Sequence, residues 1–170
     1  TLHNPKDISD RNGTYDYLNN QEGFLLLHTL SDSTYQHVMH LRKEYPKMKI
    51  IVAHLGRNGS CDYDFTTDMI DKLYSDENIY TDISTIQNPD LIRYAFKKFG
   101  SSRILYGSDF PFEKNPGIKE RDYIQPAIKA NLKDDEYDNL FFRNAEEIIR
   151  TAKIKKGRND AKDEMERWKK

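Results

Sequence analysis

The chain has 170 residues, of which 36% are hydrophobic, and its 27 basic and 28 acidic side chains leave a formal net charge of -1. This length is sufficient to bury one hydrophobic core, so we expect a single compact domain. The balanced charge gives no overall basic excess that would attract nucleic acid or an anionic membrane. The one cysteine, Cys61, excludes an intramolecular disulfide and a thiolate metal cluster.

No apolar run approaches the roughly 18 residues that a membrane helix needs. Residues 1–7 also lack the basic-then-apolar pattern of a secretion signal. We therefore expect a soluble, cytoplasmic protein that acts on a small molecule and has neither a nucleic acid nor a membrane as its partner.

Four apolar runs recur at nearly constant intervals and predict β-strands, namely residues 23–28, 49–56, 79–83 and 104–111. His54 follows His28 by 26 residues, and Asp109 follows Ile83 by 26 residues. Intervals of this size suit repeated strand-helix units in a parallel sheet, where polar residues at the strand ends emerge at one edge. Ligands of such sheets bind at that edge.

Helices are predicted between and after these strands, over residues 33–45, 64–75, 89–99, 123–132 and 135–152. The third has the clearest signals, because Asn88 can cap it, Pro89 fits its first position and Gly100 can end it. In the last helix one apolar stripe is expected to pack on the outside of the sheet. That stripe consists of Phe141, Ala145, Ile148, Ile149 and Ala152.

Three residues at the predicted strand ends have the side chains that a hard or borderline metal ion prefers: His28, His54 and Asp109. Each alone has a structural explanation, but their matching positions favour a common site. His37 and His40 lie in the first predicted helix and are interpreted as surface or packing residues.

The residues that carry these features resemble a known family. The runs Leu-Leu-Leu-His-Thr (25–29), Ile-Val-Ala-His-Leu-Gly-Arg (51–57) and Ile-Leu-Tyr-Gly-Ser-Asp-Phe-Pro (104–111), followed by Phe-Arg-Asn-Ala-Glu-Glu-Ile-Ile (142–149), are similar to the second half of an amidohydrolase-related metal-dependent hydrolase. The resemblance covers residues 1–152 and implies strands 5 to 8 of a TIM-like (β/α)8 barrel. Residues 153–170 are highly charged and are interpreted as a solvated tail or a peripheral helix.

The resemblance also implies roles for individual residues. His28 would be a ligand of a divalent metal, usually zinc, and Asp109 would bind the metal, its water, or both in turn. His54 would polarise the substrate or serve as a further ligand. An ion lowers the pKa of its water, a carboxylate can accept the proton, and an imidazole can steady charge on the substrate oxygen. Arg57 could bind an anionic group of the substrate, and His3 is a candidate pocket residue.

The chain departs from the family pattern in one important respect. It contains no His-x-His pair of the kind that the family carries on its first strand, and strands 1 to 4 have no counterpart. Four strand-helix units cannot close an eight-stranded barrel, and two ligands rarely hold a catalytic zinc. We therefore expect one of three arrangements: the chain is a fragment of a longer protein, it forms a homo-oligomer, or it associates with the missing half-barrel.

Several functions remain open at this point. The leading hypothesis is metal-dependent hydrolysis of a small, carboxylated or cyclic substrate, and decarboxylation is the alternative within the same family. A non-catalytic half-barrel that serves in binding or oligomerisation is an alternative from a different class. A general α/β domain with an anion site and no metal would leave the placement of His28, His54 and Asp109 unexplained.

Overall fold

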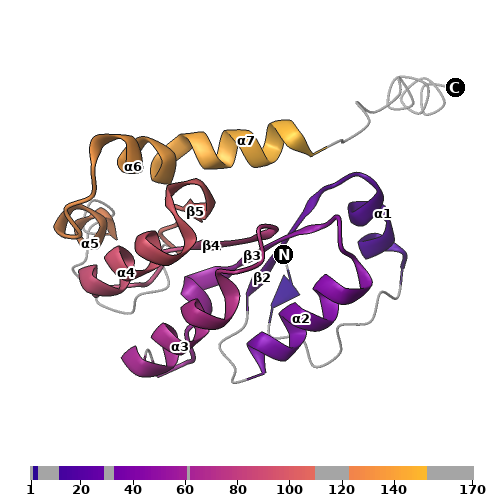
Figure 1. Cartoon of the computed structure of the whole chain (residues 1–170), viewed down its shortest axis with the longest axis horizontal. Helices are drawn as coiled ribbons and strands as arrows, with labels where there is room; N and C mark the ends of the chain where they lie inside the picture. Colours follow the sequence, from indigo (N-terminus) through magenta and orange to yellow (C-terminus); the bar gives the residue numbers. More distant parts are fainter. Residues whose placement is uncertain (1, 4–11, 29–32, 61, 110–122, 153–170) are drawn as a thin grey trace, which may run out of the picture.

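The computed structural model describes residues 2–3, 12–28, 33–60, 62–109 and 123–152. Five strands form one sheet in the order β1-β2-β3-β4-β5, the same as their order along the chain (Figure 1). Their bounds are β1 Leu2–His3, β2 Phe24–His28, β3 Lys49–Val52, β4 Ile79–Asp82 and β5 Ile104–Leu105. The predicted tail over residues 153–170 lies outside the described residues.

Every pair of neighbouring strands is parallel. His3 pairs with His28 at the end of β1 and β2, and Val52 pairs with Thr81 near the end of β3 and β4. The carboxyl ends of the strands therefore meet at one edge of the sheet. This confirms the predicted α/β class, in which parallel strands alternate with helices.

Four helices cover one face of this sheet: α1 Thr14–Asn20, α2 Thr34–Glu44, α3 Tyr63–Leu73 and α4 Pro89–Phe99 (Figure 1). Side chains cap two of them. Asn88 Oδ1 accepts the Asp90 N–H at 2.9 Å at the start of α4, as the sequence predicts. Asp62 Oδ1 accepts the Phe65 N–H at 2.7 Å at the start of α3.

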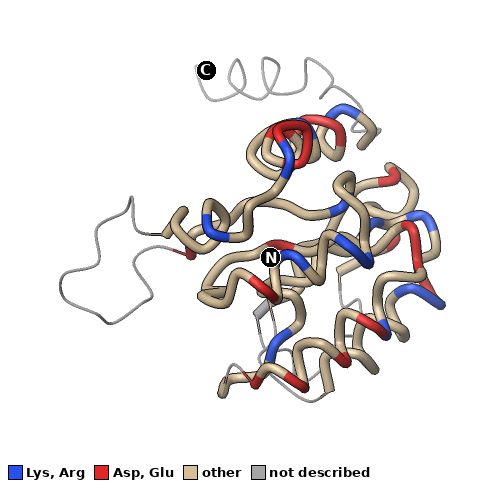
Figure 2. Tube along the Cα trace, turned by 60° about the vertical axis from the view of Figure 1, so that its left-hand side comes forward, with Lys and Arg blue, Asp and Glu red and all other residues tan. Residues whose placement is uncertain are grey.

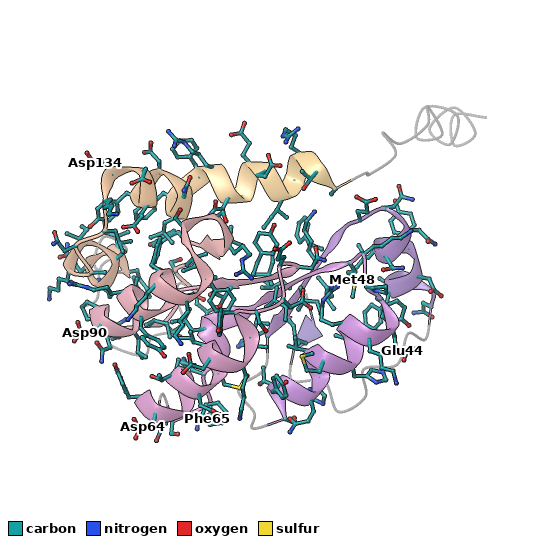
Figure 3. All side chains as sticks on the ribbon, in the orientation of Figure 1. Glu44, Met48, Asp64, Phe65, Asp90 and Asp134 are labelled. Atoms are coloured by element: carbon teal, nitrogen blue, oxygen red, sulfur yellow. The ribbon has the colours of Figure 1, made fainter. Side chains whose placement is uncertain are left out.

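The main hydrophobic core lies between these helices and the sheet, where side chains from both layers interdigitate (Figure 3). Alternate residues of the strands point toward the helices, since successive side chains of a strand lie on opposite faces. Those that are buried in this core are Leu25, Leu27, Ile50, Val52, Ile79 and Ile104. The same alternation leaves the intervening residues of each strand on the other face.

Helix α5 Gln125–Lys129 lies beside α4, and its Ala127 belongs to the main core (Figure 1). The chain then continues through α6 Asp134–Asp138, the π-helix η4 Asn139–Arg143 and α7 Asn144–Thr151. The predicted buried stripe of residues 135–152 is confirmed at Ile148 and Ala152 and is wrong at Phe141 and Ile149, which are 40% and 62% exposed. Leu140 and Asn144 are buried as well, so the buried positions 140, 144, 148 and 152 are spaced four apart. The wider π-turn at η4 is not visible in a helical pattern.

The sequence predicts that the last helix packs on the outside of the sheet, which is the face that α1 to α4 cover. Helix α7 does not lie on that face (Figure 1). Ile148 packs against Ile51 and Leu105, which point away from the main core. Lys49 Nζ donates a hydrogen bond to Thr151 Oγ1 at 3.0 Å and ties the end of α7 to the start of β3. Helix α7 therefore covers part of the face that a closed barrel would turn inward.

Two short 3-10 helices, η1 Ala53–Gly56 and η2 Ser101–Arg103, complete the described elements. Basic and acidic residues are interspersed along the described chain (Figure 2), except in α6, where four of the five residues are acidic and none is basic. Among the described residues, every helix is too short or too polar to cross a membrane.

Candidate metal and catalytic site

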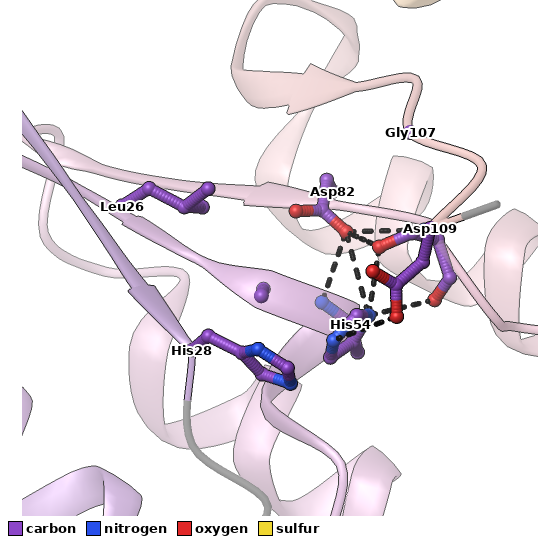
Figure 4. A pocket seen from close by; sticks show the side chains of 8 residues that line it. Leu26, His28, His54, Asp82, Gly107 and Asp109 are labelled. Carbon is purple, nitrogen blue, oxygen red and sulfur yellow. Dashed lines mark hydrogen bonds and ion pairs between the residues drawn. The ribbon is translucent and has the colours of Figure 1, made fainter. Parts of the chain in front are cut away.

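A pocket of about 300 Å³ opens at the carboxyl edge of the sheet. Figure 4 shows the side chains of His28, His54, Asp82 and Asp109 directed into this one space. The remaining lining residues are Leu26, Ala53, Ser84 and Gly107. The structure therefore brings together the three residues that the strand pattern selects, and it adds Asp82 and Ser84.

His28 is the last residue of β2, as predicted, and its side chain is partly buried. Its ring meets the His54 ring edge to face, with 4.6 Å between the ring centroids and an interplanar angle of 77°. The backbone of His3 lies beside it in register. The side chain of His3 lies outside the described residues, so its place in the pocket stays a prediction.

His54 does not lie on a strand but in the η1 turn that follows β3. Its backbone has φ 58 and ψ 37, a left-handed conformation that a residue with a Cβ adopts only at a cost in energy. Leu55 continues this conformation with φ 55. The turn directs the imidazole into the pocket rather than along the strand. Only 3% of the surface of His54 is exposed.

Asp109 lies farther from its strand than the sequence indicates. Strand β5 ends at Leu105, and three residues of irregular chain lead to Asp109, whose φ is 54. Its Oδ2 atom lies 3.8 Å from Nε2 of His54, and 29% of its side-chain surface is exposed to solvent. The loop rather than a strand tip therefore aims this carboxylate. Phe110 and Pro111, which follow it in the chain, lie outside the described residues.

Asp82 is a site residue that the sequence reasoning missed. It ends β4, so it occupies the same edge as His28, and its burial leaves only 9% of the residue exposed. Its Oδ1 atom accepts hydrogen bonds from the backbone N–H groups of His54 and Ser84, both at 3.0 Å, and from the Ser84 hydroxyl. The signal was present in the sequence, since the third predicted strand also delivers an acid at its end.

Ser84 connects Asp82 to the imidazole of His54. Its Oγ atom lies 2.7 Å from His54 Nδ1, and its carbonyl oxygen lies 3.0 Å from the same nitrogen. Thr85 Oγ1 lies at 3.5 Å. The Nδ1 side of His54 is therefore held by the chain after β4, while Nε2 faces Asp109.

Arg57 is not among the residues that line this pocket. Its Nε donates to Thr85 Oγ1 at 3.0 Å and its Nη1 donates to the Asn58 carbonyl at 2.9 Å. It lines a neighbouring pocket of about 180 Å³ with Thr66, Thr85, Ile86, Gln87, Asn88 and Leu91. A role for Arg57 in binding an anionic group of the substrate stays a prediction.

The donor chemistry of the main pocket fits a divalent metal ion, because an imidazole and a carboxylate are preferred ligands of zinc. His28 and Asp109 line the pocket together, and the Nε2 atom of His28 is shielded from solvent. Within the described part of the chain, no group of three His, Cys, Asp or Glu side chains is placed to hold an ion. The pocket therefore offers ligands of a type that suits the ion, but fewer than the three protein ligands that a catalytic zinc takes.

Comparison with known proteins places these features in a wider family. Residues 33–151 match the family model described as amidohydrolase. Among proteins of curated function, none matches the sequence.

Solved structures share the fold at low sequence identity. An amidohydrolase from Burkholderia multivorans with bound zinc superposes with a TM-score of 0.67 at 12% identity, covering 79% of this chain and 55% of that chain. A TIM-barrel protein from Bordetella bronchiseptica gives 0.64 at 15% identity, covering 87% and 53%. The 2,6-dihydroxybenzoate decarboxylase from Rhizobium gives 0.53 at 17% identity, covering 69% and 41%. The chain thus spans about half the length of these barrel proteins.

Proposed function

Because this chain belongs to the amidohydrolase family, we propose that it forms one half of the active site of a metal-dependent hydrolase that acts on a small, carboxylated or cyclic substrate. One observation carries the proposal. His28, His54 and Asp109 come from three separate strand-helix units and meet in a single pocket at the carboxyl edge of the sheet. A pocket at this edge is where parallel α/β proteins bind their ligands.

His28 and Asp109 are the residues that would hold the metal, most readily zinc. The ion supplies a Lewis acid, which makes water more acidic and polarises a substrate carbonyl. Asp109 combines a carboxylate with partial exposure, so it is placed to accept a proton from water that enters the pocket. His54 faces the same space through Nε2 and either contacts the substrate or adds a ligand.

The proposal includes a partner that completes the site. Two ligands from this chain leave a catalytic zinc at least one protein ligand short. The chain covers 55% of the zinc-containing amidohydrolase, and a second half-barrel would present further strand ends toward the same pocket. That half comes either from a second copy of this chain or from a separate polypeptide segment.

Isothermal titration of the chain with zinc tests the ligand assignment. We expect His28→Ala and Asp109→Ala each to weaken zinc binding at least about tenfold, or about 1.4 kcal/mol. His40→Ala is the matched control, because His40 is an exposed histidine of α2, and it should bind zinc as the unmodified chain does. Equal zinc affinity in all four proteins would refute the assignment.

Substrate class is tested with two reactions that separate hydrolysis from decarboxylation. Carboxylated cyclic esters probe hydrolysis, and 2,6-dihydroxybenzoate, named for one of the decarboxylases of similar fold, probes release of carbon dioxide. The zinc-loaded chain, assembled with the half-barrel that completes its site, should open the esters in a manner that a chelator abolishes. Turnover of 2,6-dihydroxybenzoate without ester hydrolysis would replace hydrolase by decarboxylase.

A non-catalytic binding or oligomerisation module is the second candidate, and one observation favours it. The described residues contain no three-group metal cluster. A module of this kind would keep its thermal stability and its assembly when zinc is added or when His28 and Asp109 are replaced by alanine. A zinc-dependent rise in melting temperature that disappears in both variants would exclude it, because only a ligand that binds the folded state stabilises it.

A further inference from the structure

We propose that Asp82 is a positioning residue that fixes the tautomer of His54, through Ser84, so that neutral His54 carries its proton on Nδ1 and presents an unprotonated Nε2 to the pocket. Its catalytic meaning rests on the proposed function, whereas the tautomer itself can be observed in the metal-free chain. The inference follows from the number of hydrogens that the groups around Nδ1 can share.

Asp82 Oδ1 is the point at which these hydrogen bonds converge. It accepts the N–H groups of His54 and Ser84, both at 3.0 Å, and also contacts the Ser84 hydroxyl. A carboxylate oxygen that accepts two N–H groups carries no proton of its own, so the hydroxyl is the donor in this contact. Because a hydroxyl has a single hydrogen, the Ser84 Oγ–H is committed to Asp82.

The Ser84 oxygen can then interact with His54 only as an acceptor. Its Oγ lies 2.7 Å from His54 Nδ1, well within hydrogen-bonding distance. A bare Nδ1 would place two lone pairs against each other at this separation. A protonated Nδ1 instead donates to Oγ, and both contacts of the hydroxyl are satisfied.

The carbonyl group of Ser84 leads to the same conclusion independently. It lies 3.0 Å from His54 Nδ1, and a carbonyl oxygen can only accept. Both close neighbours of Nδ1 therefore require a proton on that nitrogen.

The opposite side of the ring is consistent with this arrangement. Nε2 of His54 lies 3.8 Å from Asp109 Oδ2, which is beyond hydrogen-bonding distance, so the carboxylate does not demand a proton there. In neutral imidazole one nitrogen donates and the other accepts. Nε2 is therefore the acceptor, suited to take a proton or to bind a cation, and unsuited to donate a hydrogen bond to substrate oxygen.

Asp82 also supports the backbone that carries the ring. His54 has a positive φ of 58, and its N–H is held by Asp82 at 3.0 Å. A strained conformation persists when its surroundings hold it in place. The same carboxylate thus stabilises the turn and orients the hydroxyl that faces Nδ1.

Long-range 1H–15N correlation spectra of the 15N-histidine-labelled, metal-free chain measure the tautomer directly. The spectrum is recorded where the imidazoles are neutral, and the His54 signals are assigned by their loss in His54→Gln. We expect a protonated, pyrrole-type Nδ1 and an unprotonated, pyridine-type Nε2. A pyrrole-type Nε2 in the unmodified chain would overturn the proposal whatever the variants do.

Three variants separate positioning by Asp82 from general stability. Asp82→Ala should lose the pure Nδ1–H signature and give averaged nitrogen shifts, because it releases the Ser84 hydroxyl and also the His54 and Ser84 N–H groups that keep the Ser84 carbonyl beside Nδ1. Asp82→Asn should restore it, since an amide oxygen in the place of Oδ1 is also an acceptor of N–H and O–H groups. Ser84→Ala should keep Nδ1 protonated through its carbonyl group. An Asp82→Ala spectrum identical to that of the unmodified chain would overturn the role of Asp82.

Asp76→Ala is the matched control for destabilisation. Asp76 precedes β4 at the far end of the sheet, where it accepts from Arg42 Nε at 2.8 Å and from the Asn78 N–H at 2.9 Å. Its loss should lower stability and leave the His54 signals unchanged. Because the readout needs neither metal nor substrate, a failed zinc titration and a failed tautomer assignment remain distinguishable.

Discussion

Three residues around the pocket adopt backbone conformations that glycine usually provides. His54, Thr85 and Asp109 have φ values of 58, 59 and 54. Each follows a strand after a short turn, and each has a polar side chain near the pocket. Strain of this kind costs about 1–3 kcal/mol per residue and gathers at functional sites. Here it turns the side chains away from the strand direction and toward one another.

The close approach of Gly107 to Ser84 makes the hydroxyl network sensitive to one methyl group. A Cβ at position 107 would lie 3.2 Å from Ser84 Cβ and 3.7 Å from Asp82 Cγ. We expect Gly107→Ala to displace Ser84, to cost about 1–3 kcal/mol by overpacking, and to perturb the His54 nitrogen shifts. Urea denaturation and the histidine spectrum measure the two effects.

Gly100→Ala is the control for this variant. Gly100 has a φ of +73 and open space around it, so alanine there strains the backbone without touching the pocket. We expect a loss of about 1–2 kcal/mol with unchanged histidine signals. An unperturbed spectrum in Gly107→Ala would show that the Ser84 contact has no influence on His54.

The convergence of His28, His54 and Asp109 could be predicted from the sequence, because parallel strands bring their ends to one edge. The structure confirms that these residues share a pocket. The left-handed turns could not be predicted, since His54 and Asp109 are not glycines and no residue pattern marks their conformation. The strand pattern does not single out Asp82, because the third apolar run ends at Ile83 and the acid stands one residue before that end.

At the scale of elements, a buried asparagine joins the C-terminal helices to the sheet. Asn144 Nδ2 donates to the Ser101 carbonyl at 2.7 Å and to the Ile104 carbonyl at 2.8 Å. Asn144→Ala should lower the free energy of unfolding by about 1–3 kcal/mol, because the buried carbonyl groups lose their donor. Urea denaturation measures this value.

Glu146→Ala serves as the comparison on the same helix, since Glu146 is exposed. Its effect should stay within about 0.5 kcal/mol. If both variants lost the same stability, the helix as a whole and not the Asn144 hydrogen bonds would account for the change.

Tyr80, on the inner face of the sheet, is expected to make the free energy of unfolding depend on pH in the alkaline range. Burial raises the pKa of Tyr80 above its ordinary value of 10.0; the Arg103 charge opposes this shift and the Glu147 charge adds to it. The unfolded chain therefore loses the phenol proton at a lower pH than the folded one. The contribution of Tyr80 is fully present below pH 10 and is lost as pH rises through the raised value.

Tyr80→Phe should consequently unfold with a weaker dependence on pH above about 10 than the unmodified chain. Thermal melting followed by circular dichroism across that range measures the difference. Parallel pH profiles for the two proteins would show that Tyr80 does not contribute to the loss of stability.

At the element scale the strands and the extent of the helices could be predicted, whereas the buried residues of the last helical segment could be predicted only in part. The predicted range 89–99 coincides with α4, because a cap, a proline and a glycine mark its ends. The segment 135–152 contains the π-helix η4, and there Leu140 and Asn144 are buried in place of the predicted Phe141 and Ala145, while Ile148 is buried as predicted. Periodicity alone also cannot choose which face of the sheet a helix covers.

The whole molecule is a parallel sheet with four helices on one face and α7 over part of the other. A barrel turns that second face inward, and the chain spans about half of the barrel proteins it resembles. Helix α7 therefore shields apolar side chains, including Ile51 and Leu105, on the face that a second half-barrel would cover. The pocket at the carboxyl edge stays open beside it.

The position of a bound zinc ion tests the central claim most directly. Crystals of the chain grown with zinc, and measured on both sides of the zinc absorption edge, locate the ion by its anomalous signal. We predict a peak in the pocket, in contact with a His28 nitrogen and an Asp109 oxygen. A zinc peak found only at His37 or His40 of α2, with none between His28 and Asp109, would contradict the account.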